Sequence, residues 1–247
     1  MVFGHQDSIL DLENSANAND RTITLTTALD PGVDQFGIVE LTMNTNKLTI
    51  DNNGNAAYTL GTTNHRLKQL TFSSTGNGKI DLNVGINVEN IALNVNEIEL
   101  DEVNANILFN KNAVYTATGY INGNVDFQGN AGIINLANGV TIDDSVTSTG
   151  NVNGTLNFNG AGEVTGLITN ITMLQAGAGD ISLSAGGNYS ITEIQGNGNN
   201  DLTFGANSNL TGGINTSGGQ ALNLVFTNGG SVSGNIGSNA AVGDIMV

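Results

Sequence analysis

Apolar and polar residues alternate with a period of two over long parts of the chain. The clearest stretch, residues 80–103, reads IDLNVGINVENIALNVNEIELDEV, and its first five aliphatic residues occupy every second position. The alternation then slips by one residue before Ile91, again before Ile98, and once more before Val103. A period of two predicts β-strands that bury one face, and no segment sustains the 3.6-residue period of a helix.

The slips in this alternation indicate corners between short strands. A slip of one residue would turn every following side chain to the wrong face of a flat sheet. If the chain turns a corner at each slip, all the aliphatic residues point inward instead. Short strands joined by such corners and wound about one axis form a β-helix, and residues 80–103 would make about one circuit of it.

A short phrase, apolar-x-Gly-x-apolar, returns along the chain. It first appears in YINGNVDF, which starts at Tyr120, and then in NVNGTLNF, which starts at Asn151. A spacing near 20–25 residues, with insertions, is typical of one supersecondary unit stacked many times. At about 22 residues per circuit, the chain would hold roughly eleven circuits. The copies lie at residues 121–125, 152–156, 164–168, 210–214 and 232–236, and Phe127, Phe158, Phe204 and Phe226 recur in similar contexts.

These patterns predict an all-β protein, a β-helix (solenoid) with roughly 20–25 residues per rung. The alternative all-β fold is an antiparallel sandwich, which favours frequent hairpins and more aromatic residues. The segment TTNHRLKQLTF, residues 62–72, is the nearest to a helical pattern and is interpreted as a corner that enters a strand. Residues 1–50 contain Pro31 and weaker repeats, so we expect an N-terminal cap or irregular first rungs there. Residues 51–247 form the repeat region, which we expect to be truncated at the C-terminus.

Composition supports this fold. The chain of 247 residues has 40 Asn and 34 Gly but one Pro and no Cys. Asn and Gly tolerate the left-handed backbone that tight corners need. Asn side chains on successive rungs are also expected to hydrogen-bond to one another along the axis. Asn-Gly pairs start at Asn53, Asn122, Asn138, Asn153, Asn159, Asn197 and Asn228.

The charge balance excludes several classes of partner. Six Lys or Arg residues stand against 22 Asp or Glu, a formal charge of −16, and no cationic residue follows Lys111. A nucleic acid or an anionic lipid surface needs clustered cations, so neither is expected as a partner. No apolar run is long enough for a membrane-spanning helix, and no signal peptide is visible at the N-terminus. We expect an exported chain that is part of something longer.

Candidate chemistry is sparse. His5 and His65 have no Asp, Glu or Cys nearby in the sequence at the spacing of metal ligands, so both are interpreted as surface residues. The acidic cluster Glu97, Glu99, Asp101 and Glu102 is interpreted as the outward face of a strand, because no calcium-binding loop organises its oxygens. No catalytic, cofactor-binding or metal site is predicted, and no cofactor.

Two further acidic motifs are weaker candidates. GNGNNDLTF, residues 196–204, resembles a calcium-binding nonapeptide, but Leu202 follows Asp201 directly and no tandem copy is present. Asp143 and Asp144 are the strongest hint of an enzyme, because β-helices that cleave polysaccharides use paired carboxylates. The cations that such enzymes need for an anionic sugar are absent after Lys111, so a corner pair is the favoured interpretation.

Several phrases resemble a known family. YTLGTTNHRLKQLTF, GNGKIDLNV, YINGNVDFQGNAGIINLANGVTI and NVNGTLNFNGAGEVTGLI are similar to the passenger repeats of rickettsial surface cell antigens. These are large autotransporter adhesins of the outer membrane protein A and B type. The resemblance covers most of residues 58–242 and implies a right-handed parallel β-helix. It implies display on the bacterial cell surface, at the extracellular face of the outer membrane, and carries no catalytic residues.

The resemblance leaves three hypotheses for function. The first is an adhesin or invasion protein of the autotransporter type, a virulence factor that binds a protein receptor on the host cell surface. The second is a structural protein that self-associates in a surface layer. The third is a polysaccharide-degrading β-helix. The first two are not enzymes.

Overall fold

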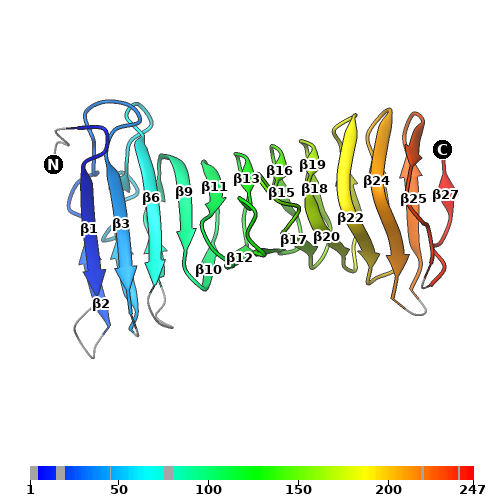
Figure 1. The fold of residues 1–247 in the computed structure, drawn as a ribbon. Helices are drawn as coiled ribbons and strands as arrows, with labels where there is room; N and C mark the ends of the chain where they lie inside the picture. Colours follow the sequence, from blue (N-terminus) through cyan, green and yellow to red (C-terminus); the bar gives the residue numbers. More distant parts are fainter. Residues whose placement is uncertain (1–4, 15–19, 45, 75–79, 218–219, 239) are drawn as a thin grey trace. The chain divides into compact units, whose positions relative to one another are not determined.

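The computed structural model describes residues 5–14, 20–44, 46–74, 80–217, 220–238 and 240–247. These residues form 27 β-strands and no helix, and the strand pairs recorded among them are parallel. The chain winds into a parallel β-solenoid of about eight turns. The predicted all-β parallel β-helix is confirmed (Figure 1). The right hand of its coil stays a prediction, in line with the general preference of parallel crossovers.

The chain divides into two compact units. Unit 1 comprises Met1–Ile98 and Val103–Ala113, and unit 2 comprises Glu99–Glu102 and Val114–Val247. The predicted boundary at residue 50 falls inside a strand of unit 1, Leu48–Asp51. The predicted cap over residues 1–50 stays a prediction.

Unit 1 contains three parallel sheets, with strand orders β1-β3-β6-β9-β11, β2-β4-β7 and β5-β8. Its β10 (Glu97–Leu100) also carries residues of unit 2. The predicted corner in residues 62–72 is confirmed, because a corner leads into β6 there. The other strands of unit 1 are β1 (Ile9–Asn14), β2 (Arg21–Thr24), β3 (Ile38–Met43), β4 (Leu48–Asp51), β5 (Thr59–Leu60), β6 (Leu67–Ser74), β7 (Ile80–Asn83), β8 (Gly85–Ile86), β9 (Val88–Asn94) and β11 (Asn106–Phe109).

Unit 2 also contains three parallel sheets, ordered β12-β14-β17-β20-β22-β24-β26, β15-β18-β21-β23-β25-β27 and β13-β16-β19. Successive strands of one sheet come from successive rungs, so the backbone visits each face once per turn. The strands are β12 (Val114–Ala117), β13 (Val125–Asp126), β14 (Ile133–Leu136), β15 (Val140–Ile142), β16 (Val146–Thr147), β17 (Thr155–Phe158), β18 (Gly162–Val164), β19 (Ile168–Thr169), β20 (Ile171–Ala176), β21 (Ile181–Leu183), β22 (Asn188–Gly196), β23 (Asn200–Phe204), β24 (Ser208–Thr216), β25 (Leu222–Phe226), β26 (Gly230–Val232) and β27 (Ile245–Met246).

Rung length varies more than the sequence indicates. In unit 2 the pairs range from Leu156–Leu174, 18 residues apart, to Leu202–Leu224, 22 residues apart. In unit 1, Leu48 pairs with Ile80, 32 residues later. The uniform 20–25-residue rung and the eleven circuits are therefore wrong, because long corners in unit 1 lengthen its turns.

The two phrases that first revealed the repeat do not stack on each other. Val125 of the first pairs with Val146, whereas Leu156 of the second pairs with Ile134. They belong to different sheets, so their 31-residue offset is not one rung. The last two copies do stack, because Leu210 pairs with Val232 and their 22-residue spacing is one turn.

The core consists of the inward residues of each strand. Inward and outward positions alternate in β3, β11, β12 and β17. The recurrent phenylalanines stack as the sequence suggests: the ring centroids of Phe204 and Phe226 lie 4.9 Å apart with the planes 7° from parallel. Tyr189 meets Phe204 edge-on at 5.7 Å, and its buried hydroxyl donates to the Leu183 carbonyl.

Glycine is required where rungs approach closely. Gly154 has φ 86°, and a Cβ there would lie 2.4 Å from Cγ of the Phe127 ring. Gly212 has φ 140°, and its Cβ would lie 1.6 Å from the Ile191 carbonyl oxygen. Both corners therefore exclude a side chain for steric as well as conformational reasons.

Outward amides form the predicted ladders between rungs. Asn157 Nδ2 donates to Asn135 Oδ1 over 3.0 Å, and Asn209 Nδ2 donates to Asn188 Oδ1 over 3.2 Å. In-register stacking places like residues next to each other, so a side chain on one rung binds its equivalent on the next.

Leu174→Ala tests this packing. Leu174 is fully buried on β20, so its truncation should lower the free energy of unfolding by about 2–5 kcal/mol. Urea denaturation followed by circular dichroism measures the loss. The matched control is Gln175→Ala on the outward face of the same strand, expected to change stability by less than about 0.5 kcal/mol. Equal effects of the two substitutions would contradict the assignment of inward and outward faces.

Candidate functional site

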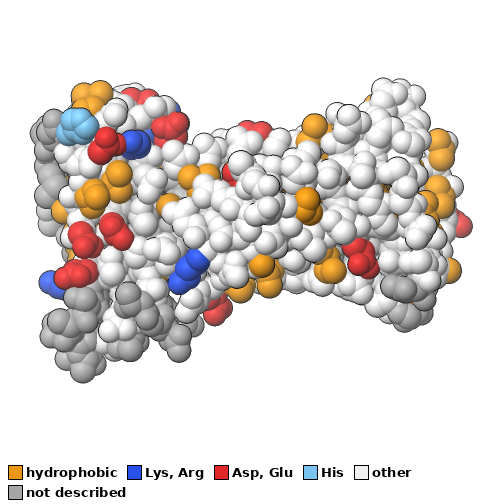
Figure 2. Space-filling view, in the orientation of Figure 1, with side chains coloured by type: hydrophobic (Ala, Val, Ile, Leu, Met, Phe, Trp, Pro, Cys, Tyr) orange, Lys and Arg blue, Asp and Glu red, His pale blue; other side chains and the backbone are white. Residues whose placement is uncertain are grey.

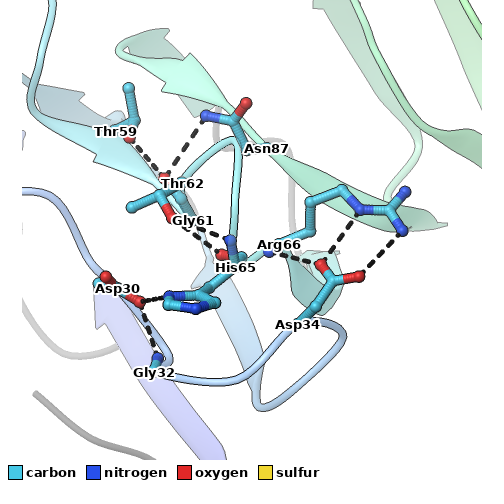
Figure 3. Close-up of polar contacts among 9 residues, drawn as sticks. All are labelled: Asp30, Gly32, Asp34, Thr59, Gly61, Thr62, His65, Arg66 and Asn87. Atoms are coloured by element: carbon cyan, nitrogen blue, oxygen red, sulfur yellow. Dashed lines mark hydrogen bonds and ion pairs between the residues drawn. The ribbon is translucent and has the colours of Figure 1, made fainter.

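A polar cluster in unit 1 joins the loop after Asp30 to the corner before β6 (Figure 3). The two segments lie side by side because Leu29 and Leu60 form a parallel bridge. Gly61 completes this corner, and its N–H donates to the Leu29 carbonyl over 3.0 Å. Adjacent turns therefore bring together residues that are more than thirty positions apart in the sequence.

His65 has a carboxylate partner that the sequence did not reveal. Its Nδ1 lies 3.0 Å from Oδ1 of Asp30, and both side chains are about half exposed. The Gly32 N–H donates to the same carboxylate over 2.7 Å. This bond and, secondarily, His65 lower the pKa of Asp30. The expectation that no acidic residue accompanies His65 is correct along the sequence but wrong in space.

Arg66 forms a two-pronged ion pair with Asp34. Arg66 Nε and Nη2 each lie 3.3 Å from an oxygen of the Asp34 carboxylate, and the Arg66 backbone N–H donates to the same group over 2.9 Å. These hydrogen bonds hold the pKa of Asp34 below its ordinary value. The pair fastens one turn to the next, so the Arg66 charge is already matched.

The other histidine lies near a different carboxylate. His5 Nδ1 is 3.7 Å from Oδ2 of Asp7, and Lys68 forms an ion pair with Asp7. Hydrogen bonding to Lys68 lowers the pKa of that carboxyl. Among the described residues, no group of three or more His, Asp or Glu side chains could hold a metal ion.

The acidic cluster around β10 has the predicted geometry. Glu97 and Glu99 are exposed, and Ile98 and Leu100 between and after them are buried. The following Asp101 and Glu102 are also exposed. These carboxylates occupy an outward face.

Asp143 and Asp144 form the predicted corner pair, between β15 and β16. Asp143 is exposed, accepts a hydrogen bond from Thr165 Oγ1 over 3.2 Å and raises the pKa of Tyr120 through a hydrogen bond. Asp144 accepts from the Ser145 N–H over 2.9 Å. One carboxylate binds the next rung and the other caps its own corner.

Asp201 belongs to a ladder along one edge of a sheet in unit 2. Its N–H donates to Asp180 Oδ1 over 3.1 Å, and its Oδ1 accepts from Asn223 Nδ2 over 2.8 Å. Leu202, directly after it, is buried. The carboxylate therefore takes part in stacking between rungs, as the rejection of a calcium nonapeptide predicted.

The sheet β12-β14-β17-β20-β22 presents an outward surface that sequence patterning did not single out. We call this surface the amide face. One column along it contains apolar residues on three rungs, and the neighbouring column consists of uncharged polar side chains. The first column is Val114, Ile133, Thr155, Met173 and Glu193, and the second is Thr116, Asn135, Asn157, Gln175 and Gln195.

The apolar residues of the amide face are exposed without serving the core. Ile133 is 36% exposed, and Val114 and Met173 are half-buried. Val152, in the corner before β17, is 54% exposed. Exposed apolar residues surrounded by polar ones are typical of binding surfaces. An outward Ile breaks the alternation of inward apolar and outward polar residues, which is the signal that could have found it.

The units differ in charge. Unit 2 carries eleven of the 22 acidic residues and no Lys or Arg, so all six basic residues belong to unit 1. In unit 1, Lys47 pairs with Asp81 over 2.6 Å. The face seen in Figure 2 is mostly white, the colour of uncharged polar side chains and backbone. Unit 2 therefore offers a surface of amides, hydroxyls and scattered carboxylates.

Within the described residues, no helix has the length and apolar character needed to cross a bilayer.

Comparison with known proteins identifies clear sequence relatives. The Outer membrane protein A of Rickettsia rickettsii is 43% identical over 248 residues, which cover 98% of this chain and 11% of that protein. The Outer membrane protein A of Rickettsia conorii (strain ATCC VR-613 / Malish 7) is 43% identical over 98% of this chain and 12% of its own length. The chain thus spans about a ninth of these relatives. The resemblance to rickettsial surface antigens is confirmed.

A second comparison concerns a short segment. The family described as SBBP, Beta-propeller repeat, matches residues 33–68. In this chain that segment contains β3, β4 and β5, which pair in parallel with strands of neighbouring rungs. No solved structure shows a significant match.

Acid titration tests the Asp30 and Asp34 contacts. Because both carboxyls have a lowered pKa, they stabilise unit 1 above the ordinary Asp value of 3.8, and this contribution is lost as the pH falls through the folded-state values. We expect the urea midpoint of the wild type to fall in that acid range. Asp30→Asn/Asp34→Asn should start from a lower midpoint at neutral pH and lose less on acidification. Parallel acid curves for the two proteins would contradict this assignment.

Proposed function

We propose that this chain, a relative of rickettsial outer membrane protein A over nearly its whole length, is part of a surface-displayed adhesin. It lies on the extracellular side of the bacterial outer membrane, in an autotransporter-type protein, and binds a protein on the host cell surface. The name of its relatives supports the outer-membrane location. Their much greater length makes the activity of the whole protein part of this proposal.

The amide face is the observation that carries the proposal. Its apolar column offers surface whose burial against a partner is favourable, at about 25 cal/mol per Å². Its amide and hydroxyl column can donate and accept hydrogen bonds without the cost of desolvating a charge. Ile133 and Asn135 alternate along one strand, so each rung supplies an apolar contact and a polar contact side by side.

The polar contacts of the corners favour a non-catalytic role. Asp143 is bonded to a threonine on the next rung, and His65 is bonded to a single carboxylate. Each of these groups stabilises a corner, and neither adjoins a second group placed for proton transfer. The proposed activity is therefore recognition by an extended surface.

Self-association in a surface layer is the second candidate, and a separate observation favours it. The ladder Asn188–Asn209–Ser231 runs over three rungs with its members exposed. Its donors and acceptors recur at the strand spacing of about 4.8 Å. A second copy of the protein presents the same repeat, so two such surfaces can match along several rungs.

Beads coated with the purified protein test adhesion. They should bind mammalian cells above the level of albumin-coated beads. The variant Val114→Thr/Ile133→Thr/Met173→Gln removes the apolar column and should weaken binding at least about tenfold, equivalent to about 1.4 kcal/mol. The matched control is Val225→Thr, on the outward face of β25, which should bind like the wild type.

Two outcomes would contradict parts of the proposal. If the folded wild-type protein binds cells no better than albumin, adhesion by this segment is rejected. If the triple variant keeps its circular dichroism spectrum and binds normally, the amide face is not the contact surface. Ordered assemblies that appear with rising concentration in light scattering would favour the surface layer instead.

A sugar-cleavage assay tests the non-catalytic role. The purified protein should release no reducing ends from acidic or neutral polysaccharides, because Asp143 and Asp144 are occupied in corner hydrogen bonds. The Asp143→Asn/Asp144→Asn variant is the control. Cleavage by the wild type that this variant loses would restore the polysaccharide-degrading hypothesis.

A further inference from the structure

The Asn-Gly corners carry a chemistry that adhesion does not use. In an Asn-Gly pair, the backbone nitrogen of Gly can attack Cγ of the preceding Asn residue. The new N–Cγ bond closes a five-membered imide, the bond between Cγ and the amide nitrogen Nδ2 breaks, and ammonia leaves. Water then opens the ring at either carbonyl to give aspartate or isoaspartate. The reaction needs a mobile Asn side chain and an accessible Gly nitrogen.

Seven Asn-Gly pairs lie within the described residues, and an eighth, Asn77-Gly78, lies outside them. Since the two residues of each pair are the same, we attribute differences in reactivity to the fold around them. The contacts of each Asn side chain and each Gly nitrogen therefore decide which pair can react.

At Asn138 both reacting groups are held by the next rung. Asn138 Oδ1 accepts a hydrogen bond from the Ala161 N–H over 3.0 Å. The Gly139 N–H donates to the Ala161 carbonyl over 2.7 Å. The side chain and the nucleophile are therefore fixed to the same neighbour, away from each other.

Asn153 is held as firmly. Its Nδ2 donates to the Gly129 carbonyl over 2.9 Å, and its Oδ1 accepts from the Gly154 N–H over 3.2 Å. Gly154 is packed against the ring of Phe127. Ring closure would have to break both hydrogen bonds and move a buried corner.

Three other pairs are restrained by stacking. Asn159 Oδ1 accepts from Asn157, and a Cβ on Gly160 would lie 2.5 Å from the Asn138 side chain. Gly198, after Asn197, lies against the backbone of Ala178. Asn122 is not free of partners.

Asn228 differs from all of these. It is exposed in the turn between β25 and β26, and the space around Gly229 is open, with no atom within 4 Å of a Cβ placed there. Among the described residues, neither the Asn228 side chain nor the Gly229 N–H makes a hydrogen bond. Asn228 is anchored through its carbonyl, which accepts from the Asn207 N–H over 3.2 Å.

Asn53 is an instructive intermediate case. It is exposed, and the space around Gly54 is also open. The Gly54 N–H, however, donates to Asn52 Oδ1 over 3.0 Å. The two pairs therefore differ chiefly in whether the attacking nitrogen is engaged.

We propose that Asn228 is a site of spontaneous deamidation in the folded protein, converted through the imide to aspartate and isoaspartate. The product adds a carboxylate to unit 2, whose charged side chains are already all acidic. Isoaspartate also inserts one extra carbon into the backbone of the turn. The open space around Gly229 accommodates that change without displacing the buried Phe226 rung.

The test is peptide mapping by mass spectrometry after incubation of the folded protein in mildly alkaline buffer. Asn228 should convert at least about tenfold faster than Asn138, Asn153 and Asn159, a barrier difference of about 1.4 kcal/mol. Asn53 should fall between them. In denaturant the pairs should react at similar rates, because the contacts that separate them are lost.

Asn228→Ser is the control variant. It should abolish the product in the peptide that contains position 228 and leave the rates at the other pairs unchanged. Conversion of Asn138 or Asn153 as fast as Asn228 in the folded protein would overturn the proposal. So would a rate order among the pairs that is the same in the folded and the denatured protein.

Discussion

The parallel, in-register hydrogen bonding between successive rungs is the constraint on which the rest of the structure depends. It places each strand about 4.8 Å from its neighbours and brings a given position next to its equivalent in the following turn. Inward positions must then be apolar on every rung, as in the series Ile134, Leu156, Leu174 and Ile194. Corners must be narrow for the same reason, which is why Gly154 meets a ring directly.

The same stacking decides what the outside can do. A polar residue that recurs on successive rungs forms a ladder, as Asn135 and Asn157 do, and an apolar residue that recurs forms a stripe. Surface patterns on a solenoid are therefore linear and repetitive, suited to contacts with extended surfaces. In unit 1, by contrast, ion pairs such as Arg66 with Asp34 take up cationic charge in holding one turn to the next. Function is thereby shifted toward uncharged recognition.

The sequence predicts the fold well where the register is regular and poorly where corners are long. Alternation predicted the strands, and the 22-residue step between Leu210 and Val232 is one turn. It could not predict that Leu48 and Ile80 would also be one turn apart, because corner length leaves no periodic trace. For the same reason the contact of His65 with Asp30 was hidden. The amide face was missed because Ile133 looks like a core residue in the sequence.

Disulfide trapping tests the in-register stacking most directly, because the protein has no native cysteine. In Asn135→Cys/Asn157→Cys the two sites are register partners on adjacent strands, within the Cα separation of about 4.4–6.8 Å that a disulfide needs. In Asn135→Cys/Gln175→Cys the sites are two rungs apart, at roughly twice the strand spacing. The account predicts rapid oxidation of the first pair and none of the second within the folded protein. Failure of the first pair to cross-link, or equal cross-linking of both, would contradict it.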